Sequence, residues 1–116
     1  MADVKTFELY WQIKCIRPVC PITGRIGTEI HHALIERGFS GLPRRDQGEI
    51  HVPWNCVLLT KEGHDRLHGV DPKLNQICIR ALIAYYGVPY IEEQIKNIPF
   101  NQKTSLQQIL ARNGLA

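Results

Sequence analysis

Four histidines in two pairs are the residues of this chain most able to do chemistry. His31 and His32 are adjacent, whereas His64 and His68 are four positions apart. The spacing of the second pair places both imidazoles on one face of a helix, where two rings can bind one metal ion. A third imidazole from the first pair would complete a site that keeps positions open for water and phosphate. The pattern therefore predicts a centre with one divalent metal ion.

Such a centre suits the hydrolysis of a phosphodiester bond. The reaction needs a deprotonated water and a cation that balances the charge developing on phosphorus and on the departing oxygen. Imidazole titrates near neutral pH, so it can take the proton of the water. Three histidines form a softer ligand set than carboxylates do. We therefore expect firm binding of Ni²⁺, Co²⁺, Mn²⁺ or Zn²⁺ and weaker binding of Mg²⁺.

The order and spacing of these residues resemble the motif of the HNH, or His-Me finger, nucleases. The matching residues are Glu29-Ile-His31-His32, then Asn55, and then His64 and His68. The likeness is strongest to the variant found in nuclease bacteriocins and covers about residues 15–69. It implies an α+β fold with a ββα-metal core, in which a short antiparallel hairpin and a helix are elaborated by C-terminal helices. It also implies cleavage of DNA to a 5′-phosphate and a 3′-hydroxyl.

The resemblance assigns a role to each histidine of the motif. His32 is expected to be the general base. The expected metal ligands are His31, His64 and His68, although His68 could instead contact the phosphate. The resemblance further implies two supporting residues. Asn55 would hydrogen-bond across the loop and orient His32, and Glu29 would orient one of the histidine ligands.

Basic residues around the motif are expected to contact DNA. Arg25 or Arg66 could hold a phosphate through paired donors. Arg44 and Arg45 lie near the end of a predicted loop and either solvate it or follow the DNA backbone. The formal net charge is +3, from 14 Lys and Arg against 11 Asp and Glu. This balance is only mildly basic, so the placement of the charges supports a nucleic-acid partner better than their sum does.

Many members of the family hold a structural zinc ion with two Cys-x-x-Cys pairs, and this chain departs from that pattern. Of the four ligand positions only Cys20 is a cysteine, and the others are Thr23, Thr60 and Gly63. A closed zinc site needs about four nitrogen or sulfur ligands. We therefore expect no structural zinc.

Length and composition indicate one globular domain. The chain has 116 residues, of which 44% are hydrophobic and 22% charged, as is ordinary for such a domain. No apolar run approaches the ~20 residues of a membrane helix, and residues 1–5 lack a signal-peptide pattern. We expect a cytoplasmic protein with reduced thiols, Cys56 and Cys78 among its core residues, and no membrane partner. A nuclease core over about 15–69 would continue into a helical extension over about 71–116.

Local patterns predict the elements that position the first histidine pair. Alternating apolar residues over 6–15 favour a half-buried strand, although Tyr10 and Ile16 also permit a helix. The elements predicted after it are a tight turn at 20–24, a short strand at 28–34, a loop at 36–47, a strand at 49–52 and an apolar run at 55–59. His51 falls in the strand predicted at 49–52 and is expected to be exposed or structural.

Capping residues predict the helices of the second half. Thr60 is expected to cap a helix that carries the second histidine pair and ends at Gly69. Three more helices are predicted from Asp71-Pro72 to Gly87, from Pro89 to Ile95, and from a cap at Thr104 or Ser105 to Asn113-Gly114. We expect the first of these three to pack on the back of the nuclease core and to take over the structural role of zinc. Its predicted apolar face consists of Leu74, Ile77, Cys78, Ala81, Leu82 and Tyr85.

Other functions stay open on this basis. A treble-clef-like module could bind DNA or RNA without cutting it, and a nuclease of recombination could act on junctions or flaps. A toxin-like nuclease is less favoured, because the sequence shows no delivery or receptor-binding segment. Compact HNH enzymes are frequent in phages and mobile elements, so the resemblance also suggests such a source. Addition of a divalent ion to supercoiled plasmid separates an enzyme from a binding module.

Overall fold

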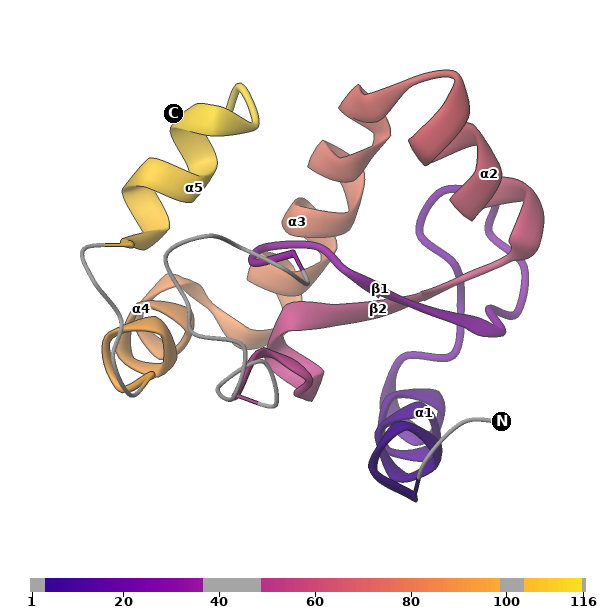
Figure 1. Ribbon diagram of the computed structural model, residues 1–116, viewed down its shortest axis with the longest axis horizontal. Helices are drawn as coiled ribbons and strands as arrows, with labels where there is room; N and C mark the ends of the chain where they lie inside the picture. The colour runs from indigo at the N-terminus through magenta and orange to yellow at the C-terminus, as the bar shows by residue number, and fades with distance from the viewer. Residues whose placement is uncertain (1–3, 37–48, 99–103, 116) are drawn as a thin grey trace.

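The computed structural model describes residues 4–36, 49–98 and 104–115. In these ranges helices surround a two-stranded antiparallel sheet, as Figure 1 shows. The elements in chain order are α1 (Val4–Ile16), β1 (Glu29–His32), η2 (Pro53–Asn55), β2 (Cys56–Leu59), α2 (Lys61–Gly69), η3 (Pro72–Leu74), α3 (Asn75–Tyr86), α4 (Val88–Lys96) and α5 (Leu106–Arg112). None of the helices described is long and apolar enough to cross a membrane.

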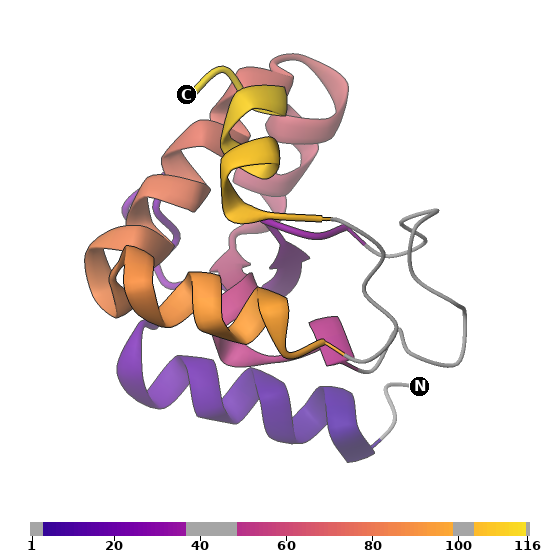
Figure 2. The same cartoon turned by 90° about the vertical axis from the view of Figure 1, so that its left-hand side faces the viewer.

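β2 is buried along its whole length because both of its faces are covered. Cys56 and Leu58 pack on Leu9 and Ile13 of α1 and form a small core. The other two residues of β2 point into a larger core that joins α3, α4 and α5. In Figures 1 and 2 the hairpin accordingly lies between α1 on one side and α3 on the other. The sheet therefore has a separate helix to support each face.

Residues 6–15 belong to helix α1, so the predicted strand is wrong and the helical alternative is the one that forms. Leu9 and Ile13 lie one helical turn apart and are buried, whereas Phe7 and Trp11 are 61% and 46% exposed. The alternating pattern assigned all four residues to one buried face. Contact with β2 decides which of them are covered, and that contact is not visible in the local sequence.

The strand predicted at 49–52 is also wrong. Glu49 and Ile50 lie in a 3-10 turn, and a bend follows at residues 51–52. The buried Ile50 carbonyl accepts a hydrogen bond from the Asn55 side chain at 2.9 Å. The Asn55 side chain thus provides the hydrogen bond that the prediction had assigned to a neighbouring strand. The loop predicted at 36–47 lies, beyond its first residue, outside the described residues.

The predicted helix caps are present. The Thr60 hydroxyl accepts a hydrogen bond from the Gly63 amide at 3.1 Å, and the Asp71 carboxylate accepts one from the backbone two residues later. Ser105 and Gln108 form a capping box at the start of α5. Each cap satisfies an amide that the first helical turn leaves without a partner. Thr60 alone separates β2 from α2, so its cap fixes where α2 begins.

α3 packs against β2, on the side of the hairpin opposite α1. Cys78 and Leu82 are fully buried, as predicted, and Cys56 is buried in the smaller core. Ile77 and Tyr85 belong to the predicted apolar face but are exposed, whereas Ile79 is buried. The buried face of α3 is therefore rotated slightly from the one that the spacing predicts.

Candidate functional site

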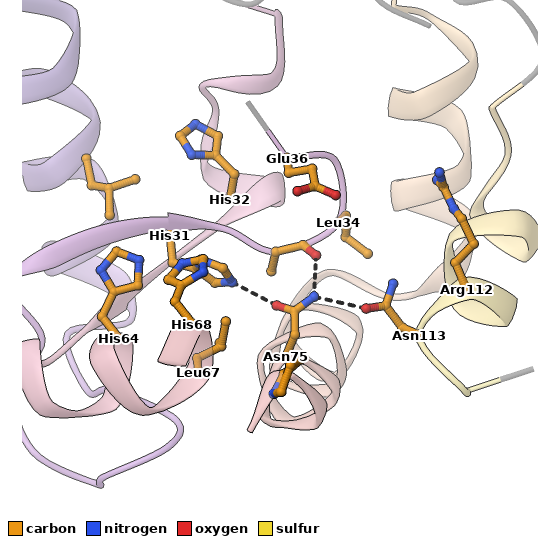
Figure 3. Close-up of a pocket in the computed structure, with 13 residues that line it drawn as sticks. His31, His32, Leu34, Glu36, His64, Leu67, His68, Asn75, Arg112 and Asn113 are labelled. Atoms are coloured by element: carbon orange, nitrogen blue, oxygen red, sulfur yellow. Dashed lines mark hydrogen bonds between the residues drawn. The ribbon is translucent and has the colours of Figure 1, made fainter. Parts of the chain in front are cut away.

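β1 and α2 bring three of the four motif histidines together. His31 comes from β1, whereas His64 and His68 come from α2. A ligand nitrogen of each lies within 4.8 Å of the others, and the ring centroids are 4.7–5.5 Å apart. In Figure 3 the three rings lie side by side in a pocket of about 590 Å³. The cluster of His31, His64 and His68, called the histidine cluster below, can hold a metal ion.

Local structure explains why these rings meet. Successive side chains of a strand point to opposite faces, so His31 shares a face with Glu29 while His32 points to the other face. The antiparallel pairing of His31 with Val57 places the ring near the strand from which α2 follows. The two histidines of α2 lie one turn apart on the side that faces β1. A hairpin followed directly by a helix is thus sufficient to form the cluster.

A chain of amide groups fixes the orientation of the His31 ring. Asn113 Nδ2 donates to the Ile109 carbonyl at 2.8 Å, so the Asn113 oxygen faces Asn75. Asn75 Nδ2 donates to this oxygen at 3.1 Å and to the Ala33 carbonyl at 2.9 Å. The Asn75 oxygen therefore lies 2.8 Å from His31 Nε2, as Figure 3 shows. Because that oxygen only accepts, Nε2 carries the proton and Nδ1 keeps its lone pair for a metal ion.

A carboxylate has the same effect on His64. Glu29 Oε1 accepts a hydrogen bond from His64 Nδ1 at 2.8 Å, so in the neutral ring Nε2 is the nitrogen with a lone pair. Glu29 is the residue to which the resemblance assigns the orientation of a histidine ligand. Two rings of the histidine cluster are thus held by acceptors outside it, and each keeps one nitrogen able to bind metal.

Burial keeps the His31 ring neutral. Its side chain is only 7% exposed, and loss of hydration lowers its pKa from 6.5 to about 4. The hydrogen bond with Asn75 raises the pKa, and the neighbouring His64 and His68 lower it further. Neutral imidazole is the form that ligates a metal ion. His31 can therefore bind an ion at neutral pH without first losing a proton.

His32 lies apart from the other three motif histidines. Its Nε2 is 3.0 Å from His51 Nδ1, and the two rings stack with centroids 5.1 Å apart. His51 Nε2 in turn lies 3.2 Å from the Thr6 hydroxyl of α1. Figure 3 shows His32 pointing away from the histidine cluster, although it lines the same pocket. The structure thus places the expected general base at the edge of the pocket.

Asn55 is fully buried and joins two backbone segments. Its oxygen accepts from the amides of Leu34 and Ile35 at 3.1 and 2.8 Å. Its nitrogen donates to the carbonyls of Ile35 and Ile50 at 2.8 and 2.9 Å. These bonds cross the loop, as the resemblance implies. They hold the backbone that follows His32 and make no direct contact with its ring.

The arginines expected to bind phosphate do not line this pocket in the part of the chain that the structure describes. Arg25 forms an ion pair on the surface, and Arg66 is exposed on α2. Arg44 and Arg45 lie outside the described residues. Arg112 of α5 does line the pocket, as Figure 3 shows, and among its described lining residues only Arg112 has a permanent positive charge.

The sequence analysis missed Asn75 and Asn113 as functional candidates and treated His51 as exposed or structural. Asn75 is 44 positions from His31, and Asn113 is 38 positions from Asn75. No periodic pattern joins residues that are so far apart. The only local signal is that both asparagines lie at helix ends, where such residues usually satisfy the backbone of their own helix.

The four positions that correspond to the zinc ligands of the resembled motif also meet, and we call them the knuckle cluster. They are Cys20, Thr23, Thr60 and Gly63. The two threonine hydroxyls are 3.1 Å apart. Cys20 Sγ accepts hydrogen bonds from the Thr60 hydroxyl at 3.9 Å and from the Thr23 amide at 3.4 Å. A Cβ atom added at Gly63 would lie 3.1 Å from Cys20 Sγ. The cluster thus has the compactness of a metal site but is closed by its own hydrogen bonds.

The buried thiols of Cys20 and Cys78 show how these hydrogen bonds change a pKa. Burial tends to raise the pKa of Cys20, but hydrogen bonds from Thr23, Thr60 and Ile22 outweigh it, so the pKa is lowered. Cys78 is buried without comparable donors, and its pKa is raised to about 12. The donors around Cys20 therefore stabilise its thiolate, as a bound metal ion would.

Comparison with known proteins identified no relative of this chain. No protein-family model, curated protein or solved structure matches the chain. The HNH hypothesis therefore depends on the spacing of the motif residues and on the geometry of the site.

Proposed function

We propose that this protein is a metal-dependent HNH endonuclease that hydrolyses phosphodiester bonds in DNA. Its ββα-metal core would consist of β1, β2 and α2. The observation that carries the proposal is the histidine cluster, whose three ligand atoms lie within 4.8 Å of one another. The order of a hairpin and then a helix, together with the motif spacing, supports the same assignment.

The side chains of the histidine cluster suit a divalent ion. Three protein nitrogen ligands leave coordination positions for a water and a phosphate oxygen. The bound ion, whether Mg²⁺, Mn²⁺, Ni²⁺, Co²⁺ or Zn²⁺, would supply positive charge to the phosphate and would lower the pKa of its water. Hydrogen bonds to Glu29 and Asn75 would keep two of the rings in a ligating orientation.

His32 would accept the proton of the attacking water. Because His31 and His32 point to opposite faces of β1, the reacting phosphodiester would lie across the edge of this strand. Residues 30–34 all line the pocket, so the strand edge is accessible from it. His51 would hold the His32 ring through its hydrogen bond. Arg112, at the other end of the pocket, would meet a flanking phosphate.

Cleavage of supercoiled plasmid tests the proposal. The wild-type protein with a divalent ion should give nicked or linear DNA, and a chelator should stop the reaction. His32→Ala should keep the metal and DNA affinities but lose at least ~10²-fold in rate, because general-base catalysis typically contributes that much. Gln12→Ala, exposed on α1, is the control and should cut like the wild type.

Two outcomes would contradict the proposal. If DNA binds but is not cut with any of the five ions, the chain is better described as a non-catalytic nucleic-acid-binding module. If His32→Ala cuts at the wild-type rate, the general base lies elsewhere, and His68 becomes the first residue to test.

A further inference from the structure

Helix α1 carries a row of aromatic rings next to His32. Phe7, Tyr10, Trp11 and Lys14 follow an i, i+3, i+4, i+7 spacing, so they share one side of the helix. The adjacent side packs on β2, and Tyr10 is partly buried against that contact. Phe7 and Trp11 are 61% and 46% exposed, and Figures 1 and 2 place α1 at one edge of the molecule. We call these four residues the aromatic face.

The side chains of the aromatic face are already in contact with one another. The Trp11 ring lies edge-on to Phe7 at 6.2 Å and to Tyr10 at 5.5 Å between centroids. Lys14 Nζ lies 5.2 Å from the centroids of both Tyr10 and Trp11 and donates to the Tyr10 hydroxyl at 3.0 Å. The face thus combines ordered rings with one cation. A ligand that stacks on it would immobilise few further side chains, so the entropy cost of binding would be small.

A pocket joins the aromatic face to the candidate active site. It has a volume of about 510 Å³ and lies between α1 and β1. Phe7, Tyr10 and Trp11 line one side, while Ile30 and His32 line the other. His32 also lines the pocket of the histidine cluster. A nucleotide next to a phosphate at the edge of β1 would therefore reach the aromatic face.

We infer that the aromatic face stacks an unpaired nucleobase adjacent to the phosphate that is cut, so that the substrate is single-stranded or branched DNA. The position of the phosphate in this inference rests on the proposed nuclease function. Aromatic rings stack on bases of any sequence, and a nearby cation attracts the backbone. A base that is paired and stacked within a duplex cannot enter such a pocket without being flipped out. Lys14 favours this anionic ligand over a second copy of the chain, whose own aromatic face would bring a second lysine.

Binding in the presence of a chelator tests the aromatic face separately from cleavage. The probes are a short oligothymidylate, an abasic oligomer of equal length and charge, and a duplex. Oligothymidylate should bind more tightly than either of the others and should quench the fluorescence of Trp11. Trp54 is buried, with 6% exposure, so its emission should stay constant.

Two substitutions and a matched control identify the rings involved. Phe7→Ala and Trp11→Ala should each weaken oligothymidylate binding by about five- to one-hundred-fold, the range for loss of one stacking ring. Trp11→Phe keeps a ring and should restore most of the affinity. Tyr90→Ala removes an aromatic ring that is also 46% exposed but lies on α4, and it should leave the affinity unchanged. Equal melting temperatures would confirm that all four variants fold.

The outcomes separate this inference from the proposed function. If neither plasmid nor single-stranded or branched DNA is cut but oligothymidylate quenches Trp11, the nuclease proposal fails and the base-binding face is supported. If Trp11→Ala binds oligothymidylate like the wild type, or if the abasic oligomer binds equally well, the inference is overturned. It is also overturned if sedimentation shows a dimer that Trp11→Ala converts to a monomer, because the face would then bind a second copy.

Discussion

The histidine cluster and the knuckle cluster differ in the direction of their hydrogen bonds. In the histidine cluster, Glu29 and Asn75 accept from outside, so His64 and His31 each keep an unprotonated nitrogen. In the knuckle cluster, Thr23 and Thr60 bond to each other and to Cys20. Both clusters gather side chains from separate segments around a small volume. Of the two clusters, only the histidine cluster has ring nitrogens whose lone pairs accept no hydrogen bond from within the cluster.

This difference gives a criterion for a metal site without a bound ion. A histidine ligand is oriented by an outside acceptor that takes a hydrogen bond from its non-ligating N–H. A lone pair that already accepts a hydrogen bond from a neighbouring group is not available to a metal ion. Groups that satisfy one another's hydrogen bonds can be as compact as a metal site without offering ligands to a metal ion. The predictions below test this distinction, from the largest expected effect to the smallest.

Loss of one ring should sharply weaken metal binding at the histidine cluster. His64→Ala removes a ligand and should weaken the affinity for Ni²⁺ or Zn²⁺ by more than ~100-fold, since loss of an outer partner alone costs 10- to 100-fold. Calorimetry measures the affinity, and Thr23→Val in the knuckle cluster is the control. A variant that still binds one zinc ion tightly would place the metal at another site.

Acid should destabilise the metal-free protein through His31. Its pKa is lowered from 6.5 in the unfolded chain to about 4 in the folded one, so between these values the unfolded state binds more protons. Stability is therefore fully present above pH 6.5 and decreases as the pH falls toward 4, by about 3 kcal/mol in total. Urea unfolding with a chelator measures this loss, and His31→Gln should show a flatter dependence. Equal slopes for both proteins would contradict the burial argument.

Removal of the Asn75 amide should weaken metal binding while the fold remains. Asn75→Ala releases the His31 ring, and we expect a 10- to 100-fold lower metal affinity. Nitrogen NMR of the imidazole should show the Nε2-protonated form of His31 in the wild type and a mixture in the variant. Asn75→Asp retains an acceptor for His31 but loses the donor to the Ala33 and Asn113 oxygens, so it should restore the affinity only in part. A single Nε2-protonated form in Asn75→Ala would mean that Asn75 does not orient the ring.

Substitutions in the knuckle cluster should change the stability of the protein but not its metal affinity. Thr23→Val breaks the bond to Thr60 and should lower the free energy of unfolding by about 0.5–1.5 kcal/mol, with no change in metal affinity. In His64→Ala, where the histidine cluster is disabled, a zinc chelator should leave the melting curve unmoved. A lower melting temperature on chelation in that variant would show that the knuckle cluster holds zinc.

Local signals in the sequence predicted the parts of the fold that depend on neighbouring residues. Thr60, Asp71 and Ser105 cap helices because a short polar side chain can reach amides two or three positions away. The i, i+4 spacing of His64 and His68 predicted their approach for the same reason. Each of these interactions is completed within about one helical turn.

Contacts between distant segments account for the errors. Helix α1 was predicted as a strand because the burial of Leu9 and Ile13 is decided by β2, more than forty positions later. The role of Asn75 depends on one partner in β1 and another after α5. The alternation of His31 and His32 on β1 follows directly from the predicted strand, but the stacking of His51 on His32 does not. The sequence thus indicated which residues meet in the histidine cluster better than which contacts hold them there.

The hydrogen bond that Asn75 donates to Asn113 also implies an order of events during protein synthesis. Asn75 is translated with α3, whereas its second orienting partner, Asn113, follows 38 positions later. Before α5 is made, only the Ala33 carbonyl orients the Asn75 amide, so the His31 ring is held less firmly. A nascent chain would therefore bind a metal ion more weakly than the complete protein, in which the last helix has docked.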